Sequence, residues 1–226
     1  MKDEKPKVIA IVGPTATGKS DLAVVLAKQY GGEIISADSR QVYRGLDIGS
    51  GKVTKKEMQG IPHHLLDVAD PKRVYSVARF QRDGRKAIAG ILKRGKIPIV
   101  VGGTGFYVDA LLLDMQFPNV KPDLTLRKKF ETLTTEELFC KLETLDPRRA
   151  EEIDEHNRVR LIRALEIATL YGPVAPLTTS SPYDIYWIGI RAETDALKER
   201  IALRLKKRMR SGMIAEFKFL HEQGLS

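Results

Sequence analysis

The sequence predicts an α/β fold, in which a parallel sheet is flanked by helices and a mostly helical insertion interrupts the core. Three observations support this fold class. Short apolar runs rich in β-branched residues alternate with segments of helical periodicity through the first 113 residues. A glycine-rich turn joins the first apolar run directly to the first helical segment. After Pro118 helix-forming residues dominate, and no clear strand follows until residue 184.

Three strands and three helices are expected in the first half of the chain. Residues 7–12, KVIAIV, form an apolar run that ends at Gly13-Pro14, which is typical of a buried parallel strand. Helical spacing of apolar residues over 20–30 stops at Gly31-Gly32. The other elements are a strand at 33–38, a helix from Ser76 to about Arg94, a strand at 96–103 and a helix from Thr104 to Leu113.

The second half of the chain is expected to leave the sheet and then return to it. We expect a first core part at 1–114, a helical insertion at 115–155 and a returning part at 156–226. In the insertion, Asp146 is placed to cap a helix that begins at Pro147. The returning part contains a Pro- and Ser/Thr-rich loop at 172–182, a strand at 184–190, a basic helix from Thr194 to about Arg210 and a further helix.

Composition excludes several classes of protein. Of the 226 residues, 42% are hydrophobic and 30% are charged, which suffices for a core and excludes disorder throughout. The sequence has neither a run of about 18 apolar residues nor the pattern of a signal peptide, so we expect a cytoplasmic protein without a membrane segment. The single cysteine, Cys140, excludes an internal disulfide and a Cys-based zinc site, and its helical neighbours predict a packed thiol.

Positive charge is concentrated in parts of the chain. The formal net charge is +9, and residues 191–210 alone hold eight basic and three acidic residues. Such a patch suits an anionic partner, either RNA or a phosphate ligand. The alternative is that these charges cover solvated helix faces, and charge alone does not decide between the two.

One motif predicts a phosphate-binding loop. Residues 13–20, GPTATGKS, match G-x-x-x-x-G-K-[ST] at every fixed position and lie between a predicted strand and a predicted helix. Glycines let the backbone N–H groups face an anion, and the helix N-terminus adds the positive end of its dipole. Lys19 brings a charge to phosphate oxygens, and the hydroxyl of Ser20 is placed to hold Mg²⁺. The sequence therefore predicts a di- or triphosphate ligand.

The acidic residue that usually accompanies such a loop is not at its usual place. Motor and switch NTPases end a neighbouring strand with an Asp that holds Mg²⁺, whereas the strand at 96–103 ends in Gly102-Gly103. Asp38 instead ends the strand at 33–38, on the sheet edge where parallel α/β sheets bind ligands. We expect a catalytic role for Asp38. The alternative is that it caps the following turn through Ser39.

Five segments follow one another along the chain: GPTATGKS at 13–20, SADSRQVYRGLDIGSGK at 36–52, IPHHLLD at 61–67, VGGTGFYVDALL at 101–112 and RVRLIRALEI at 158–167. Together, and in this order, they resemble the tRNA dimethylallyltransferases. The resemblance implies a P-loop α/β core with a helical insertion that grips the tRNA anticodon stem-loop. It also implies transfer of a dimethylallyl group from dimethylallyl diphosphate to N6 of an adenosine adjacent to the anticodon, with release of diphosphate.

The resemblance also implies roles for individual residues. Asp38 matches the general base, Thr15 matches a hydroxyl near the bridging oxygen of the leaving diphosphate, and Lys19 is placed to stabilise the charge that develops there. Mg²⁺ is the expected cofactor, on Ser20. The diphosphate-binding residues are Gly13, Pro14, Thr15, Ala16, Thr17, Gly18, Lys19 and Ser20. The tRNA-binding residues are Asp38, Ser39, Arg40, Gln41, Thr104, Arg127, Val159, Arg160, Leu161, Ile162 and Arg163.

Two departures from the family and several alternatives qualify this expectation. The family continues past position 226, so we expect either a chain that lacks the C-terminal segment of the family or a natural end there. Tyr171-Gly172-Pro173 lacks the lysine that usually follows the last segment. A P-loop small-molecule or nucleotide kinase, or a non-catalytic nucleotide-dependent RNA-binding protein, would share the loop. We expect a monomer. The pair His63-His64 favours a structural role over a metal site, and Phe106 and Tyr107 fit a prenyl pocket or the core equally.

Overall fold

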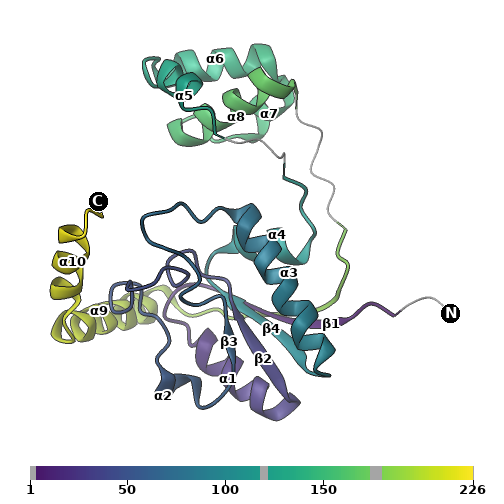
Figure 1. Ribbon diagram of the computed structural model, residues 1–226, viewed down its shortest axis with the longest axis vertical. Coiled ribbons are helices and arrows are strands. Elements are labelled where there is room, and N and C mark those ends of the chain that lie inside the picture. The colour runs from purple at the N-terminus through teal and green to yellow at the C-terminus, as the bar shows by residue number, and fades with distance from the viewer. Residues whose placement is uncertain (1–3, 118–121, 174–179, 226) are drawn as a thin grey trace. The chain divides into compact units, whose positions relative to one another are not determined.

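The computed structural model describes residues 4–117, 122–173 and 180–225. The chain divides into two compact units, Met1–Met115 with Thr179–Ser226 and the intervening Gln116–Thr178. Figure 1 shows the sheet in the first of these units, and helices but no strand among the described residues of the second. The α/β fold with a helical insertion is therefore confirmed.

Five parallel strands form the sheet of the first unit, in the order β3-β2-β4-β1-β5. The central β1 pairs Ile9 with Ile99 of β4 on one side and Lys7 with Asp184 of β5 on the other. Four of the strands were predicted, and the short β3 was not, since two residues carry no periodicity. The strands are β1 (Lys7–Val12), β2 (Gly32–Ser36), β3 (His63–His64), β4 (Ile97–Gly102) and β5 (Asp184–Gly189).

Helices cover both faces of this sheet, so its inner strands are buried on both sides. On one face α3 and α4 pack Phe80, Ile88 and Leu111 against the sheet, and on the other α1 packs Ala23 and Val24. Ser76 caps α3, as predicted, by accepting the N–H of Arg79. The helices of this unit are α1 (Lys19–Tyr30), α2 (Lys55–Met58), α3 (Val77–Lys93), α4 (Gly105–Leu112), α9 (Thr194–Arg210) and α10 (Met213–Glu222).

The second unit has its own apolar core. Leu138 and Leu142 of α6 and Leu161 and Leu165 of α8 are fully buried in it. The predicted end of the insertion at residue 155 is therefore too early, because α8 packs on α6 and remains in this unit. Residues 174–179 of the predicted loop lie outside the described residues. The helices are α5 (Leu124–Glu131), α6 (Thr135–Leu145), α7 (Pro147–Glu152) and α8 (Arg158–Tyr171).

Two smaller expectations for this unit have opposite outcomes. The side chain of Asp146 accepts the N–H of Arg149, and Pro147 is the first residue of α7, so the predicted cap is confirmed. Cys140 is exposed, and the prediction of a packed thiol is wrong. The buried stripe of α6 contains Leu138 and Leu142, four residues apart, and this spacing turns Cys140 to the other side of the helix. No helix among the described residues is long and apolar enough to cross a membrane.

An ion-pair cluster around the buried Glu33 joins β2 to the edge strand β3. The carboxylate of Glu33 accepts two hydrogen bonds from Arg94, at 3.0 and 2.6 Å, and lies 2.7 Å from Nε2 of His64 on β3. The hydrogen bonds from Arg94, with a smaller contribution from His64, outweigh burial and lower the pKa of Glu33 to about 2. The cluster therefore ties α3, β2 and β3 together. It also gives His64 the structural role that was expected.

Substitution of Glu33 should give a pH-dependent loss of stability. We expect Glu33→Gln to lower the free energy of unfolding by about 1–3 kcal/mol at pH 7. Since the folded-state pKa lies below the ordinary 4.5, the contribution of Glu33 is present above pH 4.5 and is lost as the pH falls towards 2. Urea unfolding followed by Trp187 in β5 measures the difference. The exposed Glu143→Gln is the control, and a loss that stays constant from pH 7 to pH 2 would contradict the prediction.

The ends of β2 and β4 approach so closely that only glycine fits between them. A Cβ atom on Gly102 would overlap the carbonyl oxygen of Ala37, the residue before Asp38. The backbone of Ala37 also accepts the N–H of Thr104 at 3.2 Å and donates to the carbonyl of Val101 at 2.8 Å. The glycine at the end of β4 is therefore a packing requirement, and it explains why no acidic residue stands there.

Gly102→Ala should accordingly be destabilising. We expect a loss of about 1–3 kcal/mol, the usual cost of forcing an extra methyl group into a packed site. Gly105→Ala is a matched control, because a Cβ at the start of α4 meets no atom within 4 Å. Thermal and urea unfolding of both variants provide the comparison. Equal stabilities of the two variants would contradict the packing account.

Candidate active site

The loop between β1 and α1 has the conformation that the motif predicts. Gly18, the N-cap of α1, has a φ of +86°, and a Cβ on Gly13 would overlap the carbonyl oxygen of Ile190. The ammonium of Lys19 donates to the carbonyl of Pro14 at 2.5 Å, and the hydroxyl of Thr17 donates to the same oxygen at 2.8 Å. The loop thus curls around the ammonium of Lys19 at the N-terminus of α1. A helix N-terminus is a favourable place for an anion.

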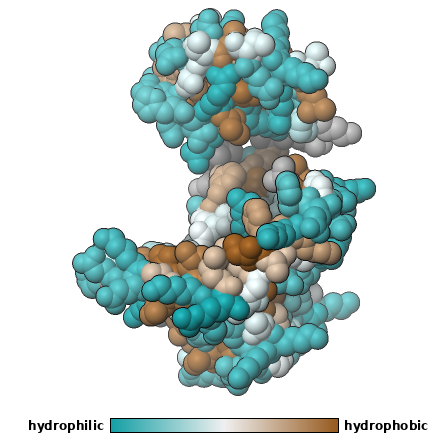
Figure 2. Space-filling model, turned by 90° about the vertical axis from the view of Figure 1, so that its left-hand side faces the viewer, coloured by the Kyte–Doolittle hydropathy of each residue, from teal (hydrophilic) through white to brown (hydrophobic). Residues whose placement is uncertain are grey.

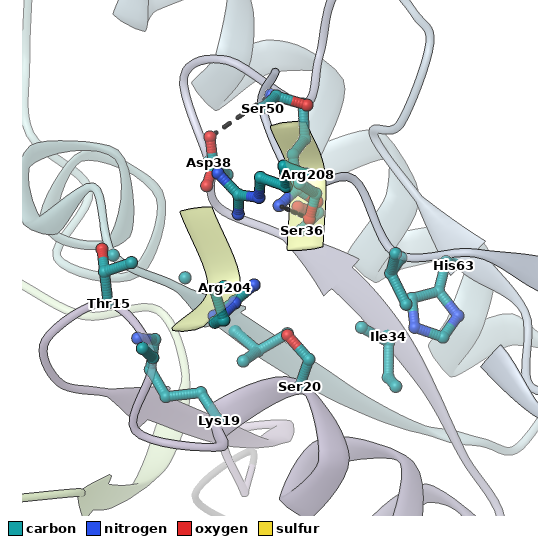
Figure 3. Close-up of a pocket in the computed structure, with 17 residues that line it drawn as sticks. Thr15, Lys19, Ser20, Ile34, Ser36, Asp38, Ser50, His63, Arg204 and Arg208 are labelled. Carbon is teal, nitrogen blue, oxygen red and sulfur yellow. Dashed lines mark hydrogen bonds between the residues drawn. The ribbon is translucent and has the colours of Figure 1, made fainter. Parts of the chain in front are cut away.

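A pocket opens beside this loop and is lined from several segments of the first unit. Figure 3 shows Thr15, Lys19 and Ser20 on one side of the opening, Asp38 on another, and Arg204 and Arg208 of α9 between them. The other lining residues are Ala16, Ile34, Ser36, Gln41, Ser50, Gly51, Val53, His63, Val101, Gly102 and Gly103. The pocket therefore lies at the carboxyl ends of β1, β2 and β4, where the parallel sheet was expected to bind its ligand.

The electrostatics of the pocket are dominated by cations. Burial and the nearby charge of Arg204 lower the pKa of Lys19, whereas the carboxylate of Asp38 raises it. Burial and Arg204 likewise lower the pKa of Arg208, which Asp38 also counteracts. Two cations whose charged forms are disfavoured by their surroundings are stabilised by an anionic ligand. The pocket is therefore suited to a polyanion such as a diphosphate.

Asp38 has one oxygen fixed by the backbone. Its Oδ1 accepts the N–H of Arg40 at 2.8 Å and the N–H of Gln41 at 3.2 Å. The capping alternative is thus realised, although through Arg40 and Gln41. No hydrogen bond to Oδ2 is present among the described residues, and Asp38 lines the pocket. The carboxylate is therefore held in place by one oxygen and presents the other to a ligand.

Thr104 lies beside this turn, although it is the N-cap residue that precedes α4. Its Oγ1 accepts the N–H of Ser39 at 3.1 Å and lies 3.4 Å from the hydroxyl of Ser39. Five of the predicted tRNA-binding residues are thereby brought to one edge of the sheet. They are Asp38, Ser39, Arg40, Gln41 and Thr104.

Lys52, which the sequence analysis did not single out, organises the segment that follows. The nearly buried ammonium of Lys52 donates to the carbonyl of Tyr43 at 2.8 Å and to the carboxylates of Asp47 and Asp67, both at 2.5 Å. The backbone N–H of Ala69 also donates to the carbonyl of Val42. These contacts therefore join the segments 36–52 and 61–67, which together form one wall of the pocket.

The other predicted tRNA-binding residues lie in the second unit and have mixed surroundings. Arg127 donates two hydrogen bonds to the fully buried Glu166, at 3.1 and 2.9 Å, and Arg163 donates to the same carboxylate. Burial raises the pKa of Glu166, but the hydrogen bonds from both arginines outweigh it and lower the pKa. Leu161 is buried in the core and Ile162 is partly buried, whereas Val159 and Arg160 are exposed. The two exposed residues are thus the accessible part of the predicted 159–163 contact.

Several residues have roles that periodicity could not distinguish. Tyr107 is buried and stacks on Phe80, with ring centroids 4.2 Å apart, so it belongs to the core. Phe106 is exposed, and neither ring lines the pocket. Burial lowers the pKa of His63, whose Nδ1 lies 2.8 Å from the carbonyl of Ile61. The described residues contain no group of three potential metal-binding side chains among His, Cys, Asp and Glu.

Arg204 and Arg208 were not predicted to line the pocket. The available signal was the excess of basic residues over 191–210, but charge does not show which of them face inward. Helical periodicity places residues 204 and 208 on one face of α9, four positions apart. Their partners at the pocket lie between residues 15 and 103, more than 100 residues earlier in the sequence, so only the fold brings them together.

Comparisons with known proteins agree with this geometry. The sequence matches the family model described as IPP transferase over residues 41–226 and the one described as isopentenyl transferase over residues 6–72. A tRNA dimethylallyltransferase of Bacillus mycoides is 43% identical over 98% of this chain and 73% of its own length. Another, of an Exiguobacterium species, is 45% identical over 98% of this chain and 73% of its own length.

Solved structures are similar as well. The tRNA isopentenylpyrophosphate transferase of Bacillus halodurans is 42% identical, with a TM-score of 0.70 over 98% of this chain and 72% of that one. A eukaryotic dimethylallyltransferase described as acting on tRNA is 30% identical, with a TM-score of 0.79 over 96% of this chain and 56% of that one. With the family match over most of the sequence and this degree of identity, the chain belongs to the IPP transferase family.

Proposed function

We propose that this chain transfers a dimethylallyl group from dimethylallyl diphosphate to N6 of an adenosine adjacent to the anticodon of tRNA, and releases diphosphate. The observation that carries the proposal is the placement of Asp38 and the phosphate-binding loop in one pocket. The pocket combines cations for a diphosphate with a carboxylate for a proton. The family of the chain supports this reaction over the alternatives.

Departure of the diphosphate is the step that the cations assist. As the bond between C1 of the dimethylallyl group and the bridging oxygen breaks, negative charge accumulates on the diphosphate. The N–H groups of the loop, Lys19 and Arg204 are preorganised donors for that charge, and the hydroxyl of Thr15 lies on the same side of the pocket. Mg²⁺ would add further neutralising charge to the phosphate oxygens.

Ser20 is the residue expected to hold Mg²⁺. Its side chain lines the pocket next to Lys19, and a hydroxyl oxygen suits a hard cation. Mg²⁺ commonly binds through few protein ligands together with substrate phosphates and water. The residues present therefore fit such an ion.

Asp38 is proposed to accept the proton that the attacking amine loses. The lone pair of N6 forms the new bond to C1, and one N6 proton passes to the carboxylate. An aryl amine is a weak nucleophile, so a positioned base contributes to the rate. The hydrogen bonds to Oδ1 fix the orientation of the carboxylate without occupying Oδ2.

Recognition of tRNA is proposed to use both units. An adenine stacked in the anticodon loop must leave the stack to reach the pocket, at a cost of a few kcal/mol. In the first unit the turn at 38–41 and Thr104 lie beside the opening. In the second unit Val159 and Arg160 are exposed. Contacts of this kind to the RNA would offset the cost of extruding the base, and a tRNA substrate supports the expected cytoplasmic location.

The decisive experiment separates prenyl transfer from kinase chemistry. Purified protein is incubated with unmodified tRNA, Mg²⁺ and either labelled dimethylallyl diphosphate or ATP labelled in its γ-phosphate. We expect the label to enter tRNA from dimethylallyl diphosphate, because the pocket presents a base for an amine. Nuclease digestion and mass spectrometry should then identify a prenylated adenosine. Label that enters an acceptor only from ATP would contradict the proposal and favour the kinase.

Asp38→Asn tests the role of the carboxylate separately from its structural role. The Oδ1 atom of asparagine can still accept the N–H groups of Arg40 and Gln41, so the turn should persist. The amide cannot act as a base, and we expect kcat to fall by on the order of 10²–10⁴-fold with little change in tRNA affinity. Single-turnover kinetics and filter binding measure the two quantities. Unchanged turnover would remove Asp38 from the chemistry, whereas tRNA binding without any turnover by the wild type would favour the non-catalytic RNA-binding alternative.

A further inference from the structure

The carboxylate of Glu216 on α10 is held by three consecutive backbone amides of the segment 47–49. Its Oε2 accepts the N–H of Asp47 at 3.1 Å and that of Ile48 at 2.7 Å, and its Oε1 accepts the N–H of Gly49 at 2.8 Å. Successive N–H groups that converge on one anion form a concave nest. A Cβ on Gly49 would lie 3.2 Å from Oε1, so the absence of a side chain there lets the carboxylate approach.

Glu216 lies on a helical hairpin that has little other attachment. None of the residues of α9 and α10 is buried, and large apolar side chains such as Leu203 and Phe217 remain exposed on them. Figure 2 views the molecule from the side on which this hairpin lies and shows hydrophilic and hydrophobic surface next to each other on that side. Since no buried apolar side chain fixes the hairpin, its few polar contacts to the core decide where α9 lies.

Those polar contacts meet on one segment of the pocket wall. Besides Glu216, the guanidinium of Arg208 donates to the carbonyl of Gly49 at 3.3 Å. The same wall is fixed from its other side, because Lys52 ties it to Asp47 and Asp67. Ser50 and Gly51 of this wall line the pocket together with Arg204 and Arg208. The segment 47–51 is thus fixed by contacts from two sides, and Glu216 contributes three of the hydrogen bonds that join the hairpin to it.

We propose that Glu216 is a positioning residue, which locks the α9–α10 hairpin onto residues 47–49 and thereby keeps Arg204 and Arg208 in the pocket. Glu216 does not line the pocket itself, so its effect on a ligand passes through the two arginines. This inference deepens the proposed function and rests on it for the identity of the ligand as a diphosphate. The carboxylate of Glu216 therefore supports a binding site for an anion without contacting that anion.

The first test measures the binding of inorganic diphosphate with Mg²⁺ by calorimetry. Glu216→Ala should weaken binding by on the order of tenfold, because two cations are no longer held at the ligand. Glu216→Gln keeps one acceptor oxygen and should recover part of the affinity. Glu222→Ala, an exposed residue at the end of the same helix, is the matched control and should bind as the wild type does. Affinity of Glu216→Ala equal to that of the wild type would overturn the proposal.

The second test asks whether the effect passes through the arginines. In an Arg204→Ala, Arg208→Ala background, the further substitution Glu216→Ala should change diphosphate affinity by less than about twofold, because coupled residues are not additive. A loss as large as in the wild-type background would assign Glu216 another role. Unfolding followed by Trp187 fluorescence shows whether each variant keeps its fold, and Glu216→Gln replaces Glu216→Ala where the latter does not.

The third test needs no ligand and therefore separates this inference from the proposed function. Hydrogen exchange followed by mass spectrometry should show faster exchange in Glu216→Ala for the peptides that contain residues 47–49, with unchanged exchange in β1 and β4. Unchanged exchange at 47–49 would overturn the proposal even if prenyl transfer is established. A protein that lacks prenyl transfer but shows faster exchange and weaker diphosphate binding would contradict only the proposed function.

Discussion

The constraint on which the site depends is the gathering of positive charge in a partly buried pocket. Lys19, Arg204 and Arg208 share that space with a single carboxylate, Asp38. Burial and mutual repulsion disfavour the charged forms of Lys19 and Arg208, as the lowered pKa of each shows. Without a ligand, the positive charges of the pocket exceed its negative charge, and a bound polyanion would neutralise the excess. The charges of the pocket therefore favour an anionic ligand, whatever further contacts that ligand makes.

Two parts of the fold supply these charged groups. One is the parallel sheet with the loops that follow its strands, and the other is the α9–α10 hairpin that is attached to it. The parallel sheet brings the ends of β1, β2 and β4 to one edge, which positions the phosphate-binding loop and Asp38. The two arginines come from a hairpin outside the core. They depend on the segment 47–51, which Lys52 holds from one side and Glu216 from the other. Most of the pocket is thus built from the sheet and the loops that follow its strands, and two lining residues, Arg204 and Arg208, come from the docked hairpin.

This division explains how much could be predicted from the sequence. The phosphate loop and the position of Asp38 were predictable because a contiguous motif and the geometry of parallel strands are sufficient to place them. Arg204 and Glu216 were not, since their partners lie more than 100 residues earlier in the sequence. Lys52 was not either, because its partners, 5 to 15 residues away, lie outside the helices and strands that periodicity reveals. The boundary of the second unit was misplaced because the helical pattern of α8 does not reveal which core it joins. Roles that require tertiary contacts leave no local signal.

In the second unit, the structural role of Arg127 is compatible with the RNA contact that is expected of it. Arg127 uses Nε and one terminal nitrogen to hold Glu166, and a third of its side chain stays exposed. A guanidinium has five donors, so further N–H groups remain for a phosphate. An arginine already fixed by a buried carboxylate loses less conformational freedom when it binds a ligand. The buried Glu166 would then prepare Arg127 for RNA, which is the same relation that we infer between Glu216 and the arginines of the pocket.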